Sequence, residues 1–161
     1  MLPNPSTLQP ISPVNFMPRR SDARKCVVQM LYVADQNPDV DIHWVRENIE
    51  ERLTDDAQLV DFAWRMFTGV REQQDSIDER ITKVAANWRV DRMAPTDRNV
   101  LRLGIFEMEI MQTPAAVVLN ECIELAREFG SENSPSFVNG ILDKFAASDT
   151  TPSTDAEASP S

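Results

Sequence analysis

The residues best suited to binding a ligand lie near the start of the chain, where cations, an amide and an aromatic ring recur at helical spacing. Positions 19 to 25 hold four basic residues against a single acid, Asp22. A helix over residues 21 to about 36 would bury one apolar stripe: Ala23, Val27, Met30, Leu31 and Ala34. It would turn the opposite face outward: Ser21, Arg24, Lys25, Val28, Gln29 and Tyr32.

This outward face carries the three kinds of group that single-stranded RNA needs. Cations hold phosphates, an amide can read a base edge, and a tyrosine ring can stack on an unpaired base. The alternative is an ordinary solvated helix face with a few arginines, and the residues alone favour that alternative.

A second candidate site lies at the start of the last helix. Ser134 and Pro135 are typical of a helix start, and the apolar stripe that follows is Val138, Ile141, Leu142 and Phe145. Phe137 is offset by about 100° from that stripe. An aromatic ring beside free backbone N–H groups could stack a base and hold a phosphate. Spacing alone favours the other interpretation, a hydrophobic flank packed on a neighbouring helix.

The preceding segment predicts an amphipathic helix with a signal at each end. Thr113 is a good N-cap, Pro114 can occupy the first helical position, and Gly130 can take a left-handed stop. One face of this helix is apolar: Val118, Cys122, Leu125 and Phe129. It is therefore predicted to be a core helix.

Four further helices are predicted from the apolar periodicity and the caps. They start near Asp41, at Asp55 or Asp56, at Asp75 or Ser76, and at Thr96. The last of these is apolar on nearly every face, which places it at the centre of a bundle. With the first and the two closing helices this makes about seven, and no segment alternates as a strand would. The predicted fold class is all-α.

Composition indicates a single folded domain between two tails. Residues 1–18 contain five prolines and no charge, and residues 148–161 are mostly polar, so both are expected to be disordered. Residues 19–147 remain as the folded domain. The N-terminal arm lacks the basic start and continuous apolar run of a secretory signal, and nowhere do eighteen apolar residues run together, so a cytoplasmic protein without membrane contact is expected. Cys26 and Cys122 are interpreted as buried thiols, with a disulfide as the alternative.

The net charge of −10 at first argues against a nucleic-acid partner. At 0.15 M salt, however, the Debye length is only about 8 Å, so local charge matters more than the total. Residues 35–61 hold nine acids against two arginines, a local net charge of −7. The acidic groups are therefore concentrated away from the basic start of the first helix.

The sequence lacks the usual signs of an enzyme or a metal centre. His43 is the only histidine, and no glutamate lies three residues before it. The chain has no phosphate-binding glycine loop, and the two cysteines lack zinc spacing. We therefore expect no catalytic residues, no metal and no cofactor.

Three stretches resemble the bacterial NusB family. The closing pattern of that family, INEAIELAKxFG followed by KFVNGVLDK, appears here as LNECIELAREFG and SPSFVNGILDKF. The basic opening helix that ends in ALQxLY appears as RRSDARKCVVQMLY, and APTDRNVLRL with Phe106 and Glu107 matches a DPVERAVLRL and YEL segment. The resemblance runs from about Arg19 to Ala146, and it implies two small helical subdomains packed together.

The resemblance also implies a function in transcription antitermination. NusB proteins bind the boxA element of ribosomal RNA leader transcripts together with NusE, a small-subunit ribosomal protein, and the complex helps RNA polymerase to resist termination. Some relatives form homodimers. Carried over by position, RNA contact is expected at Arg19, Arg20, Arg24, Lys25, Gln29, Tyr32, Phe137 and Asn139.

The NusE surface is assigned to three residues at the start of the central helix: Asp97, Arg98 and Arg102. Their alternative role is capping and surface pairing on that helix. The RNA assignment requires the basic helix start and Phe137 to lie close enough to contact one strand.

The chain departs from the family pattern at several positions that concern charge. Ser21 and Asp22 stand where a third basic residue is frequent, and Ala116 and Ser136 stand where lysines are common. Asn133 replaces a common acid. Because lost cations weaken the grip on phosphates, binding would depend more strongly on NusE. A NusB-like adaptor that binds protein but has lost its RNA affinity is the alternative function.

Overall fold

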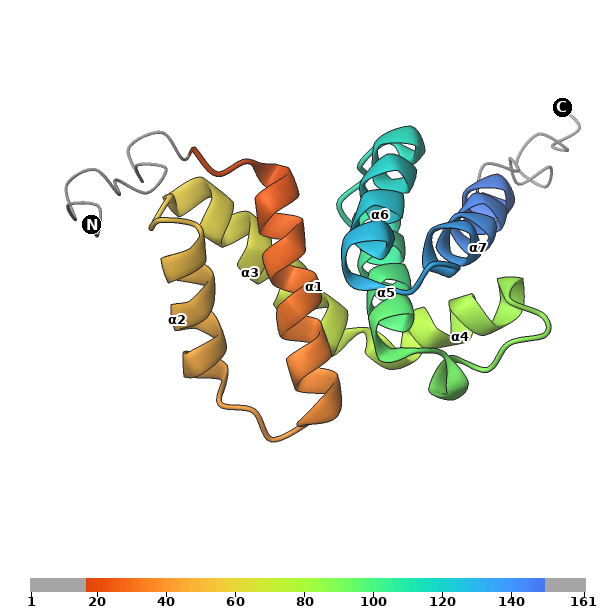
Figure 1. Ribbon diagram of the computed structural model, residues 1–161, viewed down its shortest axis with the longest axis horizontal. Coiled ribbons are helices and arrows are strands. Elements are labelled where there is room, and N and C mark those ends of the chain that lie inside the picture. Colours follow the sequence, from red (N-terminus) through yellow and green to blue (C-terminus); the bar gives the residue numbers. More distant parts are fainter. Residues whose placement is uncertain (1–16, 150–161) are drawn as a thin grey trace, which may run out of the picture.

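The computed structural model describes residues 17–149 of the 161-residue chain, and Figure 1 shows them as two groups of helices. The first group is α1 (Arg20–Gln36), α2 (Ile42–Arg52) and α3 (Ala57–Glu72). The second is α4 (Gln74–Val84), the 3₁₀ turn η2 (Val90–Arg92), α5 (Pro95–Glu109), α6 (Ala115–Phe129) and α7 (Ser134–Asp149). The described residues contain no strand, and the predicted all-α fold of about seven helices is confirmed.

Most of both predicted tails lies outside the described residues. Only Met17 and Pro18 of the N-terminal arm are described, and α7 continues to Asp149, so it includes the first two residues of the predicted C-terminal tail.

Two predicted caps are present in the structure. The Asp41 carboxylate accepts a hydrogen bond of 2.9 Å from the backbone N–H of His43 at the start of α2. The Asp56 carboxylate accepts one of 3.2 Å from the N–H of Leu59 at the start of α3. Each carboxylate satisfies a backbone donor that has no partner within its helix, which explains where these helices begin.

The start of α6 differs from the prediction by one position. Pro114 is the residue before the first helical position, and the Thr113 hydroxyl donates to a carboxylate oxygen of Glu107 at 3.1 Å instead of capping α6. The buried Glu107 carboxylate, on the helix before this turn, lies within reach of the hydroxyl, and the cap pattern of α6 alone could not anticipate that contact.

The prediction that Gly130 adopts a left-handed stop is wrong. Its φ of −96° and ψ of −166° are extended, and no described glycine has a positive φ. The position instead requires a close approach, because a Cβ atom here would lie 2.4 Å from the Ser134 hydroxyl oxygen. Glycine therefore lets α6 and α7 follow each other through a very tight connection.

The helix α5 is the centre of the molecule, as its continuous apolar pattern predicted. It contacts α1, α3, α4, α6 and α7, and Val100, Leu101, Leu103 and Ile105 are completely buried. Cys26 and Cys122 are buried in this core, and both are free thiols, so the disulfide alternative is not realised. Because α5 touches helices of both groups, it fixes the two groups relative to each other.

We expect Gly69→Ala to destabilise the protein although alanine favours helices. A Cβ at position 69 would lie 2.2 Å from the ring of Phe106, where α3 packs on α5. Overpacking of this kind costs about 1–3 kcal/mol, which exceeds the ~1 kcal/mol that alanine gains over glycine in a helix. Urea unfolding measures the difference. Gly140→Ala is the matched control, since a Cβ there meets open space, and equal stability of the two variants would refute the clash.

Candidate nucleic-acid interface

The expectation that Arg24 offers an exposed cation is wrong. Its exposed fraction is 3%, and its Nε donates to the two carboxylate oxygens of Glu107 at 3.1 and 2.9 Å. Its Nη2 makes a further short contact with the same carboxylate. Glu107 itself is fully buried. Arg24 therefore joins α1 to α5 in a forked ion pair, and its guanidinium is not available to a phosphate.

The other residues of the basic cluster point in two directions. Arg19 and Arg20 are exposed, and the Arg20 guanidinium lies 4.8 Å from the centre of the Phe62 ring on α3. Lys25, on the side of α1 that faces α6, forms a 3.0 Å ion pair with Glu128, and both side chains are close to half exposed. An exposed pair of this kind contributes little to stability, so Lys25 can exchange Glu128 for a phosphate at small cost.

Further along the same side of α1, Gln29 and Tyr32 line a shallow groove of about 450 Å³. We call it the tyrosine groove, and its lining is Val28, Gln29, Tyr32, Val33, Thr96 and Phe129. The Tyr32 side chain is 41% exposed, so one face of its ring can receive a base. Val28, predicted to point outward, is only 1% exposed, because it packs at the floor of this groove.

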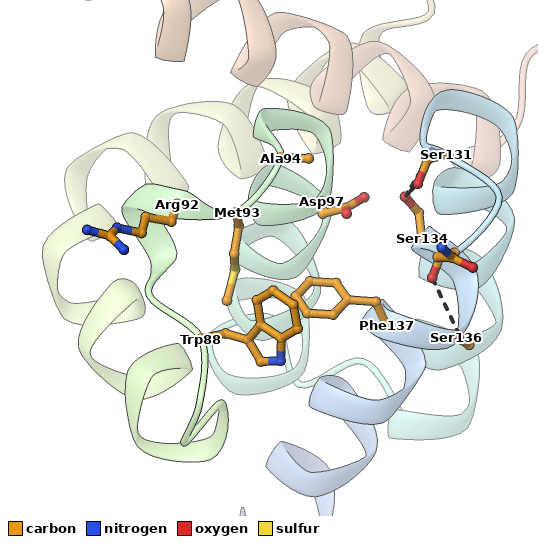
Figure 2. Close-up of a pocket in the computed structure, with 10 residues that line it drawn as sticks. Trp88, Arg92, Met93, Ala94, Asp97, Ser131, Ser134, Ser136 and Phe137 are labelled. Atoms are coloured by element: carbon orange, nitrogen blue, oxygen red, sulfur yellow. Dashed lines mark hydrogen bonds between the residues drawn. The ribbon is translucent and has the colours of Figure 1, made fainter.

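A second hollow, of about 490 Å³, opens where the segment before α5 meets the start of α7 (Figure 2). We call it the aromatic pocket, and it is lined by Trp88, Arg92, Met93, Ala94, Asp97, Ser131, Asn133, Ser134, Ser136 and Phe137. The ring of Phe137 meets that of Trp88 edge to face, with centroids 5.4 Å apart and planes at 76°. Figure 2 shows the Asp97 carboxylate directed from α5 toward Ser131 and Ser134.

Both interpretations of Phe137 describe part of what the structure shows. The ring packs against the core as a hydrophobic flank, yet it stays partly exposed and lines the aromatic pocket. Asn139, two residues on, is exposed and lines neither hollow. Only Phe137 of this pair is thus placed where a base could stack.

The tyrosine groove and the aromatic pocket are neighbours in the fold, because adjoining residues of the chain line both. Thr96 lines the groove and Asp97, the next residue of α5, lines the pocket. The end of α6 does the same, with Phe129 in the groove and Ser131 in the pocket. The structure therefore brings Gln29 and Tyr32 close to the hollow that contains Phe137, although they are more than a hundred residues apart in the sequence.

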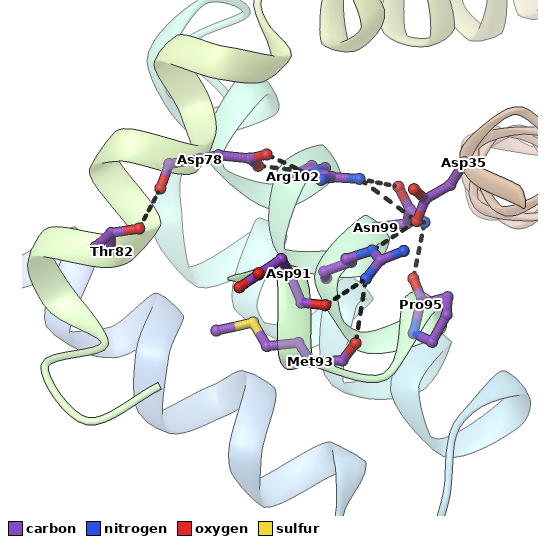
Figure 3. A network of polar contacts seen from close by, with 9 residues as sticks. Asp35, Asp78, Thr82, Asp91, Met93, Pro95, Asn99 and Arg102 are labelled. Carbon is purple, nitrogen blue, oxygen red and sulfur yellow. Dashed lines mark hydrogen bonds and ion pairs between the residues drawn. The ribbon is translucent and has the colours of Figure 1, made fainter. Parts of the chain in front are cut away.

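Two of the three residues assigned to the NusE surface, Arg98 and Arg102, form ion pairs within the protein, and Figure 3 shows the pair of Arg102 with Asp78. Arg102 is 4% exposed and donates to Asp78 on α4 at 2.8 and 2.9 Å, and Arg98 donates to Asp35 on α1 at 2.6 Å. The side chain of Asp97 is buried in the aromatic pocket, with an exposed fraction of 8% for the residue. The expectation that Asp97 and Arg102 lie on the surface is therefore wrong.

The ion pair between Arg98 and Asp35 affects the pKa of the Asp35 carboxyl. Burial on its own would raise the pKa of the Asp35 carboxyl, but hydrogen bonds from Arg98 and Asn99, with the charges of Arg98 and Arg102, hold that pKa below its ordinary value. The carboxylate is thus stabilised in its charged form, and it ties α1 to the start of α5. Arg98 also donates to the Met93 carbonyl oxygen at 3.3 Å, which fixes the segment beside the aromatic pocket.

The roles of Glu107 and Trp88 in the candidate interface were not identified from the sequence. Glu107 is an acid within a helix that is otherwise apolar on nearly every face, a signal that a buried cation must exist elsewhere. Trp88 follows α4 in an irregular segment, where no periodicity indicates its direction, and it is 57% exposed. A large exposed aromatic ring outside a helix is the signal that could have marked it as a binding residue.

Within residues 17–149, no group of three or more His, Cys, Asp and Glu residues is arranged to hold a metal ion. None of the helices described is long and apolar enough to cross a membrane.

Comparison with known proteins identifies the family to which this fold belongs. The family model described as "NusB family" matches residues 21–147. The chain is 40% identical over 137 residues to a protein of Anaeromyxobacter dehalogenans named "Transcription antitermination protein NusB", covering 80% of this chain and 91% of the relative.

Solved structures agree with the sequence matches. A NusB structure from T. maritima superposes with a TM-score of 0.74 at 33% identity, covering 88% of this chain and 99% of that one. A structure described as "Crystal Structure of Antitermination Factors NusB and NusE in complex with dsRNA" has a TM-score of 0.72 at 24% identity, covering 80% and 96%. The relatives at 40% and 41% identity are both named as transcription antitermination proteins, and this is the class of protein that the chain resembles. Within that class, the chain belongs to the NusB family.

Proposed function

We propose that this protein binds boxA-type single-stranded RNA in ribosomal RNA leader transcripts, together with NusE, and so helps RNA polymerase to resist termination. The observation that carries the proposal is the adjacency of the tyrosine groove and the aromatic pocket, which offers two partly exposed aromatic surfaces to one strand. Because bases of any kind can stack on such rings, this arrangement suits unpaired RNA. The protein would act in the cytoplasm by holding surfaces together, without bond chemistry.

The proposed RNA contacts divide by chemistry. Lys25 and Arg19 would hold phosphates, Gln29 would contact a base edge, and Tyr32 and Phe137 would stack on bases. Arg20 and Asn139 are exposed but lie outside the two hollows, so we place them at the margins of the strand. Arg24 is removed from the contacts, because its guanidinium is buried against Glu107.

The NusE partnership is supported by family membership and by the fold shared with the NusB and NusE complex. Of the three residues first assigned to the NusE surface, only Arg98 keeps any exposed area of note, and it is paired with Asp35. The surface that binds NusE would therefore be formed by residues other than Asp97 and Arg102. A second copy of the chain could cover the RNA face when RNA and NusE are absent.

A second candidate function is an adaptor that binds protein but not RNA. One specific observation favours it: of the four basic residues at positions 19–25, Arg24 is buried and Lys25 is paired with Glu128. In a chain with a net charge of −10, few cations are then available to hold phosphates.

The affinity for a boxA-type RNA strand, measured with and without NusE, separates the two candidates. We expect weak binding by the protein alone and an affinity roughly 5- to 150-fold higher with NusE, the usual range for coupling between two ligands. A strand of the same composition in scrambled order is the control. If the boxA strand binds under neither condition, the adaptor function stands. Light scattering on the free protein tests for the homodimer in the same samples.

A further inference from the structure

The tyrosine groove and the aromatic pocket share a feature that points to a ligand. Among the described residues, two buried side-chain oxygens lack any hydrogen-bond partner, Oε1 of Gln29 and Oδ1 of Asp97. Gln29 lines the tyrosine groove and Asp97 lines the aromatic pocket. A buried acceptor without a donor is costly, so nearly all such groups in folded proteins have partners. Each oxygen is covered in the free protein, and a turn of its side chain toward the hollow that the residue lines would let a bound molecule supply the missing donor.

Of the two unpaired oxygens, that of Asp97 says more about the chemistry of the ligand. The residue is 92% buried, since its exposed fraction is 8%, yet its side chain lines an open pocket. An ionised carboxylate accepts hydrogen bonds and donates none, so the missing partner must carry N–H or O–H groups. Within residues 17–149 no cluster of acids, cysteines and histidine surrounds it, so a metal ion would lack ligands there.

The walls of the pocket favour a flat partner. Trp88 is 57% exposed, and its edge-to-face contact with Phe137 leaves indole surface open to the pocket. Rings of this kind stack on nucleobases, because every base presents a flat π-face. The hollow of about 490 Å³ has room for one base beside them.

Among the four bases, guanine matches a carboxylate best. It carries two N–H donors side by side, N1–H and the 2-amino group, which can meet both oxygens of one carboxylate as a guanidinium fork does. Uracil offers one ring N–H, and adenine and cytosine offer an exocyclic amino group without an adjacent ring N–H. Charge-assisted hydrogen bonds are about twice as strong as neutral ones, so the carboxylate would discriminate strongly.

We propose that the aromatic pocket binds a single guanine of the RNA strand, with Asp97 accepting its N1–H and 2-amino hydrogens and Trp88 and Phe137 stacking on the ring. This inference rests on the proposed RNA function and adds a base preference to it. The negative charge of Asp97 does not exclude the strand, because Arg92 lines the same pocket and can offset the repulsion of a nearby phosphate. Trp88 and Asp97 thereby become specificity residues that differ from the expected RNA contacts.

The test measures binding of oligouridine strands that carry one guanosine at successive positions, in the presence of NusE. At one position guanosine should raise the affinity at least about tenfold over uridine, the effect of a hydrogen bond to a charged group. Inosine, which lacks the 2-amino group, should lose most of that gain. In Asp97→Asn the guanosine preference should disappear, and with it the difference between guanosine and inosine.

Asp143→Asn is the matched control, since it removes one negative charge from exposed α7 surface outside the pocket. It should keep the guanosine preference, and Trp88→Leu should lower the affinity for the guanosine strand. The proposal is overturned if Asp97→Asn keeps the difference between guanosine and inosine, or if it weakens all strands equally. It is also overturned if Asp97→Asn weakens NusE binding without RNA while the base preference stays, because the acceptor then serves a protein donor. Failure of every strand to bind would overturn the proposed function as well.

Discussion

Replacing Glu107 by glutamine is expected to lower the free energy of unfolding by about 3–5 kcal/mol, the range for removing one partner of a buried ion pair. Glu107 is fully buried, and its carboxylate receives the forked contact of Arg24 and a hydrogen bond from Thr113. Glutamine keeps the shape but loses the charge. The Arg24 guanidinium, itself 3% exposed, would then keep a negatively charged partner only in the more distant Glu121 carboxylate at 3.7 Å. Urea unfolding followed by circular dichroism measures the loss.

Two further variants test whether the loss comes from the buried ion pair. Glu121→Gln removes the partner that is 22% exposed and should cost less than about 1 kcal/mol, as partly exposed pairs do. The double variant Arg24→Met and Glu107→Leu removes both charges at once, and it should recover most of the stability, since a buried pair can often be replaced by apolar residues at little cost. An unfolding midpoint for Glu107→Gln equal to that of Glu121→Gln would contradict the assigned role of the pair.

The same double variant decides the role of Arg24 in RNA binding. If Arg24 only joins α1 to α5, a folded double variant keeps the affinity for RNA. If its guanidinium leaves Glu107 to hold a phosphate, that affinity falls and the salt slope becomes shallower by about 0.7 units for the lost contact. The structure leads us to expect the first result, because exchanging Glu107 for a solvated phosphate would leave a buried carboxylate unpaired.

The helices were predictable because their signals are local. Asp41 and Asp56 cap helices three residues or fewer away, and the apolar periodicity of α5 was visible without knowledge of any neighbour. The turn at Gly130 was interpreted wrongly because glycine serves two purposes. A left-handed conformation and a close approach to Ser134 both require glycine, and only the folded chain shows which one applies.

The polar residues were harder to place, for a physical reason. Helical periodicity indicates which side of a helix is apolar, but it cannot show that a charged residue finds a buried partner of opposite sign. Arg24 and Glu107 are 83 positions apart, and Arg98 and Asp35 are 63 positions apart. Such pairs are created by packing α1 against α5. Arg24 was therefore predicted to be an exposed cation, and Arg102 to be a surface residue.

The residues of the candidate site also fall into two groups, those that the sequence identifies and those that only the fold identifies. Gln29, Tyr32 and Phe137 could be selected from residue type and family resemblance, and the structure places them along two adjoining hollows. Trp88 and the unpaired oxygen of Asp97 could not be selected, because their significance depends on the aromatic pocket itself. That pocket is formed by the segment before α5, the start of α5, the α6–α7 connection and the start of α7, which meet only in the folded protein.

Replacing Tyr32 and Phe137 together by leucine is expected to lower the affinity for boxA-type RNA by far more than either change alone. Stacking of one base on an aromatic ring contributes about 1–3 kcal/mol, so each single variant should lose roughly 5- to 150-fold. The two rings lie in separate hollows, so the losses should add in free energy and multiply in affinity. Fluorescence anisotropy at several salt concentrations, in the presence of NusE, measures both affinity and salt slope.

The salt dependence distinguishes stacking from a general loss of fit. Neither substitution removes a charge, so the slope of affinity against salt should stay unchanged, whereas Lys25→Gln should lower it by about 0.7 units while costing less affinity. Trp44→Leu is the matched control, because Trp44 is 42% exposed, close to the 41% of Tyr32, and lies on α2 outside both hollows. A double variant no weaker than the poorer single variant would mean that the two rings never stack on the same strand. The tyrosine groove and the aromatic pocket would then have to be separate binding sites, because the two losses of binding free energy add only when both rings contact the same RNA.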